Sequence, residues 1–173
     1  MNRRHIISVL VENHFGVLAR IASLIAGRGF NIDSLSVGET EDSTISRMTI
    51  VTHGDEQIVE QIIKQLNRLV DVIKVTDLTE SAHVARELVL MKVHTPTPAV
   101  RSEVIQITEV FRANVVDIST TTATIEITGE SNKIDAIIEM MEPFGIRELA
   151  RTGVVSLGRE RSSKDSSFEA RVA

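Results

Sequence analysis

The chain contains no cysteine, tryptophan or tyrosine, and only five of its 173 residues are phenylalanine. Without cysteine there can be no disulfide, and no thiolate for catalysis or metal binding. Few aromatic rings leave little surface for stacking on single-stranded bases. The net charge of −5 also argues against nucleic acid, because phosphate contacts need clustered lysine and arginine. We therefore expect no nucleic-acid partner and a core of aliphatic side chains.

Long hydrophobic runs are also missing, and none approaches the roughly 20 residues that cross a bilayer. The first five residues lead directly into a strand pattern, with no apolar signal-peptide segment. Apolar residues make up 42% of the chain, which suffices for a core and is too high for a disordered protein. These features predict a soluble cytoplasmic protein without a membrane partner.

The periodicity of apolar residues predicts the order β-α-β-β-α-β in the first half of the chain. The expected strands are 6–11, 32–37, 46–52 and 70–75, and the expected helices are 17–25 and 59–66. Gly29 suits the end of the first helix, and Asp55 is a candidate N-cap for the second. This order is typical of a small antiparallel sheet covered by two helices.

The same order returns in the second half, with strands at 88–93, 114–118 and 124–128 and helical patterns at 104–111 and 134–141. One apolar stripe repeats at a spacing of 75 positions: Val59, Ile62, Ile63 and Leu66 become Ile134, Ile137, Ile138 and Met141. We therefore predict an α+β protein with two ferredoxin-like β-α-β-β-α-β modules in tandem, their antiparallel sheets covered by helices on one face.

We place the two modules at residues 1–79 and 80–158, with the boundary in the polar stretch 79–83. Residues 159–173 are polar, and we expect them to form a disordered tail. Each module has only about 75 residues, and its open sheet face and edges need cover. We therefore expect a homodimer formed by sheet-edge or helix pairing.

Signatures of catalysis are absent: there is no Walker loop, no G-x-G-x-x-G after a strand and no G-x-S-x-G elbow. None of the five histidines has zinc-ligand spacing or a neighbouring set of carboxylates in the sequence. Acidic groups such as Glu39/Glu41/Asp42 are able to bind a divalent cation weakly, but loop polarity and helix capping explain them better. We predict no catalytic residue and no metal site.

The turn from Asn13 to Gly16 joins the first strand to the first helix. An ordinary strand–helix connection also uses Asn and Gly in this way. However, a helix N-terminus with free backbone N–H groups suits a carboxylate, and glycine leaves room for a ligand. The Asn13 amide can donate to a carboxylate and accept from an ammonium group, and so can Asn31 from the next strand, which we expect beside the first. The pattern favours an α-amino-acid site, and its apolar wall would come from Phe15, Val17, Leu18, Ile32 and Leu35.

The corresponding turn of the second module reads Thr95-Pro96-Thr97-Pro98. Proline has no N–H to donate, and no glycine opens the start of the helix. We expect that this module does not bind the same ligand in the same way, and that it serves dimer packing or contact with another protein.

Segments spread along the chain resemble the small, regulatory subunits of acetolactate (acetohydroxyacid) synthase. They are residues 8–13, 16–20, 28–35, 46–50, 65–72 and 151–155, and the resemblance covers roughly residues 3–160. It implies that the first module is an ACT domain, an amino-acid-sensing unit. It also implies a homodimer that binds valine, or leucine or isoleucine in some members, at the interface between paired ACT domains.

The resemblance further implies a separate, large catalytic subunit that carries thiamine diphosphate, FAD and Mg²⁺, while this chain binds no cofactor itself. That enzyme condenses two pyruvates, or pyruvate with 2-oxobutyrate, and the small subunit raises its activity and confers feedback inhibition. The ligand positions of the family fall on Asn13, Gly16 and Asn31, next to Val17, Leu18 and Ile32; Gly38 and Gln61 match positions near the same site. Relatives more commonly carry alanine at position 38. The alternatives are a freestanding ACT-type amino-acid sensor and a small enzyme with an unrecognised carboxylate site.

Overall fold

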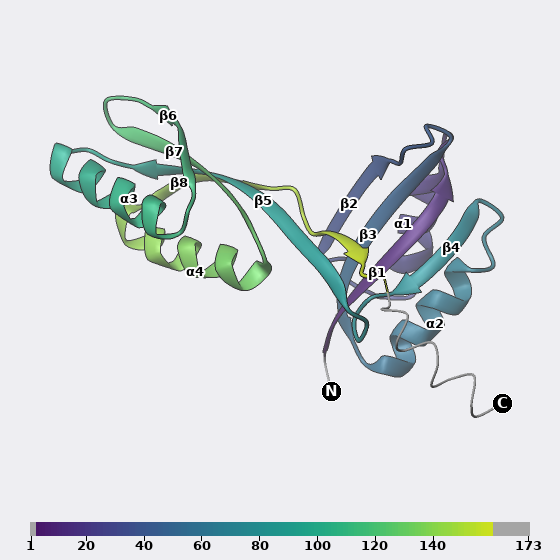
Figure 1. Ribbon diagram of the computed structural model, residues 1–173. Coiled ribbons are helices and arrows are strands. Elements are labelled where there is room, and N and C mark those ends of the chain that lie inside the picture. The colour runs from purple at the N-terminus through teal and green to yellow at the C-terminus, as the bar shows by residue number, and fades with distance from the viewer. Residues whose placement is uncertain (1–2, 161–173) are drawn as a thin grey trace.

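The computed structural model describes residues 3–160 and divides them into two lobes (Figure 1). The first lobe contains β1 (Arg3–Glu12), α1 (Val17–Ala26), β2 (Ser34–Glu39), β3 (Ile45–Gly54), α2 (Glu56–Leu66) and β4 (Val72–Asp77). The second contains β5 (His83–His94), α3 (Pro98–Val110), β6 (Asn114–Ile118), β7 (Thr122–Gly129), α4 (Ser131–Met141), a 3₁₀ turn (Glu142–Phe144) and β8 (Ile146–Arg151). β9 (Val155–Gly158) follows. Residues 161–173 of the expected tail lie outside the described residues.

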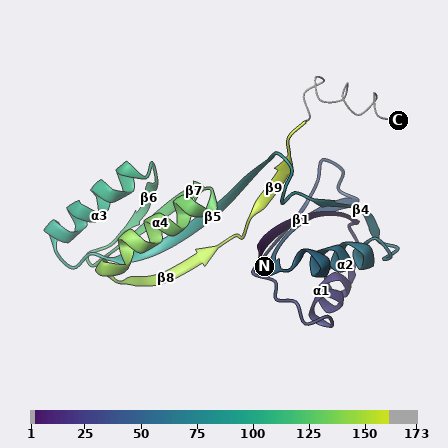
Figure 2. The same cartoon turned by 90° about the horizontal axis from the view of Figure 1, so that it is seen from below.

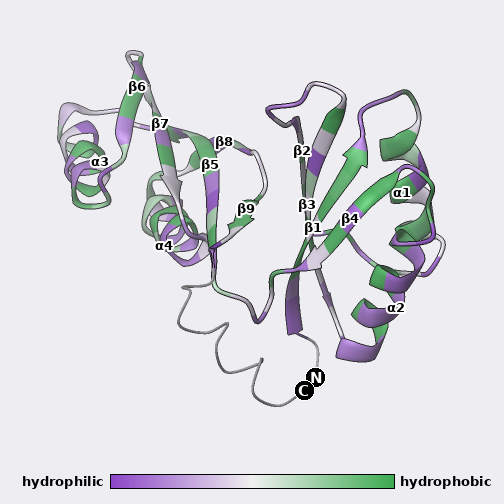
Figure 3. Cartoon of the chain, turned by 45° about the vertical axis from the view of Figure 1, so that its right-hand side comes forward, coloured by the Kyte–Doolittle hydropathy of each residue, from purple (hydrophilic) through white to green (hydrophobic). Residues whose placement is uncertain are grey.

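The first lobe is an antiparallel sheet in the order β2-β3-β1-β4, with α1 and α2 on one face (Figure 2). Alternate residues of β1 point toward the helices, so that Ile7, Val9 and Val11 are buried. The apolar stripes of α1 and α2 complete this aliphatic core, which Figure 3 shows as hydrophobic stretches along β1, β3 and the helices. Burial of alternating strand residues against a helical stripe explains why the sequence periodicity predicted these elements.

The second lobe repeats this plan, with the sheet order β6-β7-β5-β8 and with α3 and α4 on one face (Figure 2). Helix α4 occupies residues 131–141 and α2 occupies residues 56–66, so the predicted repeat at a spacing of 75 positions is confirmed. Phe111 follows the last residue of α3 and packs, partly buried, at the rim of the second core. The predicted α+β class with two antiparallel, helix-covered sheets is therefore confirmed.

A short two-stranded ribbon lies between the lobes, and the sequence patterns did not predict it. β5 begins at His83, five residues before its expected start, and its first four residues pair with β9. This two-stranded ribbon lies on the outer face of the first sheet, where Val154 is buried with Ile6, Val51 and Leu78. A third, small core thus joins the end of the described chain to the first lobe.

Candidate functional site

The turn between β1 and α1 has the open geometry that the sequence predicted. Gly16 is the N-cap of α1 with φ of +88°, and its backbone conformation favours glycine. Among the described residues no side chain caps this helix, and its first turn carries no acidic residue. Within residues 3–160, the backbone N–H groups of Leu18 and Ala19 have no acceptor. This end of α1 can therefore donate to an anion from outside the described chain.

A buried carboxylate holds the turn in place. Asp71, whose side chain is 7% exposed, contacts Arg20 and lies 3.1 Å from Nε2 of His14, and its carbonyl accepts the Glu12 N–H at 2.9 Å. His14 Nε2 also lies 3.3 Å from a Glu12 oxygen. The sequence shows no set of carboxylates next to a histidine, but the fold brings Asp71 next to His14 from 57 positions away. Arg20 already neutralises Asp71, so the carboxylate needs no metal ion for its charge.

The side chain of Asn13 links the turn to the hairpin between β2 and β3. Its Nδ2 donates to Glu39 Oε1 at 3.1 Å and to the Ser43 carbonyl at 2.9 Å. A shallow cavity of about 390 Å³ lies beside it, lined by Glu12, Asn13, His14, Thr44, Ile45 and Ile73. Asn13 thus lies at the end of β2 that carries Glu39, at an exposed edge of the first lobe.

Asn31 lies at the opposite end of the same sheet. We expected its strand beside β1, but β3 lies between β1 and β2, so this expectation is wrong. Asn13 is bonded to Thr44 and Asn31 to Thr52, eight residues further along β3, which corresponds to roughly 25 Å. The Asn31 amide donates to Asp33 Oδ1 at 2.9 Å. Within one chain, the two asparagines cannot hold one small ligand.

The other predicted site residues differ in exposure. Val17 is 3% exposed and points into the core of its own lobe, whereas Leu18 is 45% exposed. Ile32 is partly buried against the first core. Gly38 is exposed on the edge strand β2, and Gln61 is exposed on α2. Among the predicted apolar neighbours, Leu18 therefore presents the more accessible surface.

The equivalent turn of the second lobe is closed. Thr95 N–H bonds to the Thr121 carbonyl, as Asn13 N–H does to Thr44. The Thr97 side chain caps α3 by accepting from Val100 N–H at 3.3 Å, and Pro98 occupies the first helical position. This helix start therefore offers fewer free donors than that of α1.

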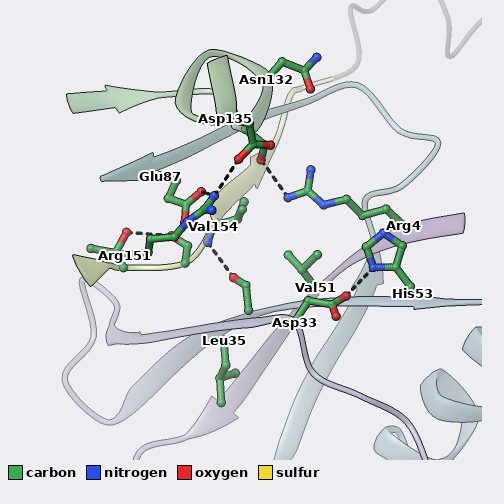
Figure 4. Close-up of a pocket in the computed structure, with 14 residues that line it drawn as sticks. Arg4, Asp33, Leu35, Val51, His53, Glu87, Asn132, Asp135, Arg151 and Val154 are labelled. Carbon is green, nitrogen blue, oxygen red and sulfur yellow. Dashed lines mark hydrogen bonds and ion pairs between the residues drawn. The ribbon is translucent and has the colours of Figure 1, made fainter. Parts of the chain in front are cut away.

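A larger cavity of about 640 Å³ lies between the lobes (Figure 4). On one wall, His53 Nδ1 and Asp33 Oδ2 are 2.6 Å apart. On the other, Arg151 makes two 2.8 Å hydrogen bonds to Glu87, whose side chain is 4% exposed, and reaches Asp135 at 3.4 Å. The hydrogen bonds to Glu87 raise the pKa of Arg151 above its usual value. No sequence signal identified this cluster, because its members come from five separate segments of the chain.

Comparisons with known proteins agree with this architecture. A family model described as "Small subunit of acetolactate synthase" matches residues 86–160, and one described as "AHAS small subunit-like ACT domain" matches residues 7–74. The acetolactate synthase small subunit of Aquifex aeolicus is 58% identical over 167 residues, which are 96% of this chain and 87% of the relative. This chain belongs to the family of acetolactate synthase small subunits.

Two further relatives support the assignment to the acetolactate synthase small subunits. A probable acetolactate synthase small subunit of Methanothermobacter thermautotrophicus is 54% identical over 155 residues, which are 90% of this chain and 92% of the relative. The crystal structure of the small subunit from Thermotoga maritima has a TM-score of 0.83 and 42% identity, and the match covers 92% of this chain and 99% of that one.

As a member of this family, the chain is a regulatory, non-catalytic subunit with an ACT domain, and it acts with the large subunit in the regulation of branched-chain amino acid biosynthesis. Within residues 3–160, no helix is both long enough and apolar enough to span a membrane.

Proposed function

We propose that this chain is the amino-acid sensor of acetolactate synthase. In this proposal residues 1–79 bind a branched-chain amino acid, valine first, and residues 80–158 form a second regulatory domain. The chain raises the activity of the large subunit, and the bound amino acid reverses this as feedback inhibition. The observation that carries the proposal is the uncapped start of α1 at Gly16, with free N–H groups at Leu18 and Ala19.

The open turn has the properties that an α-amino acid requires. Helix N–H groups and the helix dipole favour a carboxylate. A Cβ built at Gly16 meets no atom within 4 Å, so there is room for the ligand at this point. Phe15 is fully exposed and Leu18 is 45% exposed, which leaves apolar surface beside the donors. A branched aliphatic side chain would bury this surface on binding.

A homodimer would complete the site. Asn13 bonds to Glu39 at the end of β2, and Asn31 lies three residues before the start of β2 at Ser34. β2 pairs with β3 along one edge, and within residues 3–160 its other edge has no partner strand. Antiparallel pairing of two β2 strands would bring Asn13 of one copy next to Asn31 of the second. Each dimer would then hold two ligands, each between two asparagine amides.

Regulation would follow from linkage between binding and assembly. The amino acid shifts the equilibrium between two arrangements of the dimer toward the one that binds it more tightly. The free energy of this shift cannot exceed the difference between the binding free energies of the two arrangements. The large subunit would carry thiamine diphosphate, FAD and Mg²⁺, and this chain would contribute no reacting group. In this proposal, no residue of this chain binds a cofactor.

Two measurements test the proposal. We expect the chain alone to be inactive, the large subunit to gain activity when the chain is added, and valine to inhibit the mixture. Calorimetry with valine, leucine and isoleucine should rank their affinities. Asn31→Ala should raise the Kd at least tenfold, because a desolvated polar group loses its partner. Asn114→Ala, on the exposed edge strand β6, is the matched control and should leave it unchanged.

The rival hypothesis gives a different result. A freestanding ACT-type sensor would bind the amino acid but leave the activity of the large subunit unchanged. Absence of binding by all three amino acids would contradict both hypotheses.

A further inference from the structure

The loop that carries Asn31 contacts the end of the described chain directly. Ser34 Oγ accepts the Val154 N–H at 2.9 Å, 120 positions away in the sequence. Two residues later, Ser156 N–H donates to Thr49 Oγ1 at 3.4 Å. Val154 is 3% exposed in the small core between the lobes. Residues 152–156, which we call the C-terminal strap, therefore contact the first lobe directly after the segment 31–33 that carries Asn31.

Gly153 makes this contact unusually close. Its φ is +79°, and a Cβ at this position would lie 2.6 Å from Ser34 Oγ and 3.5 Å from Leu35 N. No other amino acid fits here without moving the strap or the Ser34 side chain. A shift of Ser34 therefore displaces Gly153, or the Ser34–Val154 hydrogen bond breaks.

Polar contacts hold residues 31–33, which lead into Ser34. The Asn31 amide donates to Asp33 Oδ1, and Asp33 Oδ2 lies 2.6 Å from His53 Nδ1. If the Asn31 amide turns toward a ligand, Asp33 loses a donor, and Ser34 is the next residue. Ser34 is three positions after Asn31, so a rearrangement at Asn31 acts within about 10 Å of the strap.

The other end of the strap is clamped to the second lobe. Arg151 forms a bidentate pair with the buried Glu87 on β5 and also contacts Asp135 on α4. A movement of Gly153 thus reaches two elements of the second lobe through one side chain. The cavity of about 640 Å³ between the lobes borders Asp33 and Ser34 on one side and these three residues on the other (Figure 4).

We propose that the contact of Ser34 with Gly153 and Val154 transmits amino-acid binding from the ACT module to the second module. Ser34 and Gly153 are positioning residues, since neither needs to touch the ligand. This proposal rests on the proposed function, because it needs an amino acid at Asn31. It predicts that ligand binding and inhibition of the large subunit can be separated by mutation.

The experiment compares L-valine binding by the full chain with valine inhibition of the complex with the large subunit. Ser34→Ala removes the hydrogen bond without adding bulk, and Gly153→Ala adds the clashing Cβ. For both, we expect a valine Kd within twofold of wild type, normal activation, and an inhibitory concentration raised at least fivefold. Ser36→Ala is the matched control, because the Ser36 side chain points to the same face of β2 and makes no hydrogen bond to any residue within 3–160.

The outcomes are distinguishable. Wild-type inhibition in Ser34→Ala would overturn the proposal, and so would a parallel loss of valine binding, since the contact would then build the site rather than transmit from it. If Gly153→Ala fails to fold, Ser34→Ala still decides. Failure of the wild-type chain to bind valine would instead contradict the proposed function.

Discussion

Gly16→Asp is the substitution that tests the proposed carboxylate site most directly. An aspartate at the N-cap of α1 can accept from the free N–H groups of Leu18 and Ala19, and so occupies the donors that the ligand needs. Its charge would also repel the ligand carboxylate, and two like charges about 5 Å apart near a protein surface repel each other by about 3 kcal/mol. Together these effects should raise the valine Kd at least about 100-fold.

The same substitution has a small structural cost. Gly16 has φ of +88°, and aspartate is among the residues that tolerate this region best, so we expect a loss of about 1 kcal/mol in the free energy of unfolding. Gly145→Asp is the control: it adds the same charge at φ of +90° in the second lobe, where the nearest atom to a Cβ is 3.8 Å away. Gly16→Asn fills the turn without the charge.

Calorimetry with valine and thermal unfolding of each variant measure these effects. We expect Gly145→Asp to bind valine as wild type does, Gly16→Asn to bind more weakly, and Gly16→Asp not to bind measurably. Activation of the large subunit should persist in both Gly16 variants, because Gly16 lies in the first lobe, far from the second core. Wild-type affinity in a folded Gly16→Asp protein would refute the reasoning.

Three further substitutions or titrations test the dimer, the second core and a turn. Val37 is 42% exposed on the edge of β2 that has no partner strand in the described part of the chain. Val37→Lys should convert the dimer to a monomer in light scattering, whereas Ile73→Lys on β4 should not. Equal behaviour of the two variants would contradict pairing through β2. Phe111→Ala should lower the free energy of unfolding in urea by about 2 kcal/mol, less than the 3–5 kcal/mol of a fully buried phenylalanine, and no loss would contradict its packing at the rim. Hydrogen bonds from Thr44 lower the pKa of Asp42 below its usual 3.8, so this carboxylate favours the folded hairpin above that pH and loses the effect as the pH falls through the lowered pKa. A carboxyl NMR titration with a midpoint at or above 3.8 would contradict this.

Repeated apolar spacing made most of the fold predictable. The stripes on α2 and α4 recur because each covers an aliphatic sheet, and a buried helix face must repeat about every 3.6 residues. β9 carried no such signal. It has four residues, and it is a strand because it pairs with His83–Arg86, about 70 positions earlier, rather than because of its own pattern.

The candidate site was predictable only where it is local. The turn at Gly16 could be predicted because a strand, a glycine and a helix follow one another in the chain. The position of Asn31 relative to Asn13 could not be predicted in this way. It depends on β3, which follows both asparagines in the sequence and lies between β1 and β2 in the sheet. The pairing of His14 with Asp71 and of Arg151 with Glu87 likewise depends on chain segments brought together by the fold.

The return of β9 to the first sheet has a consequence during synthesis on the ribosome. The helix-covered face of the first lobe uses residues up to Val75, so it can assemble early. Its opposite face, with Ile6 and Val51, stays uncovered until Val154 has been made and has left the exit tunnel. While about 80 more residues are translated, this hydrophobic surface remains exposed and prone to aggregation. Chaperones that recognise exposed aliphatic strands can bind it during this interval.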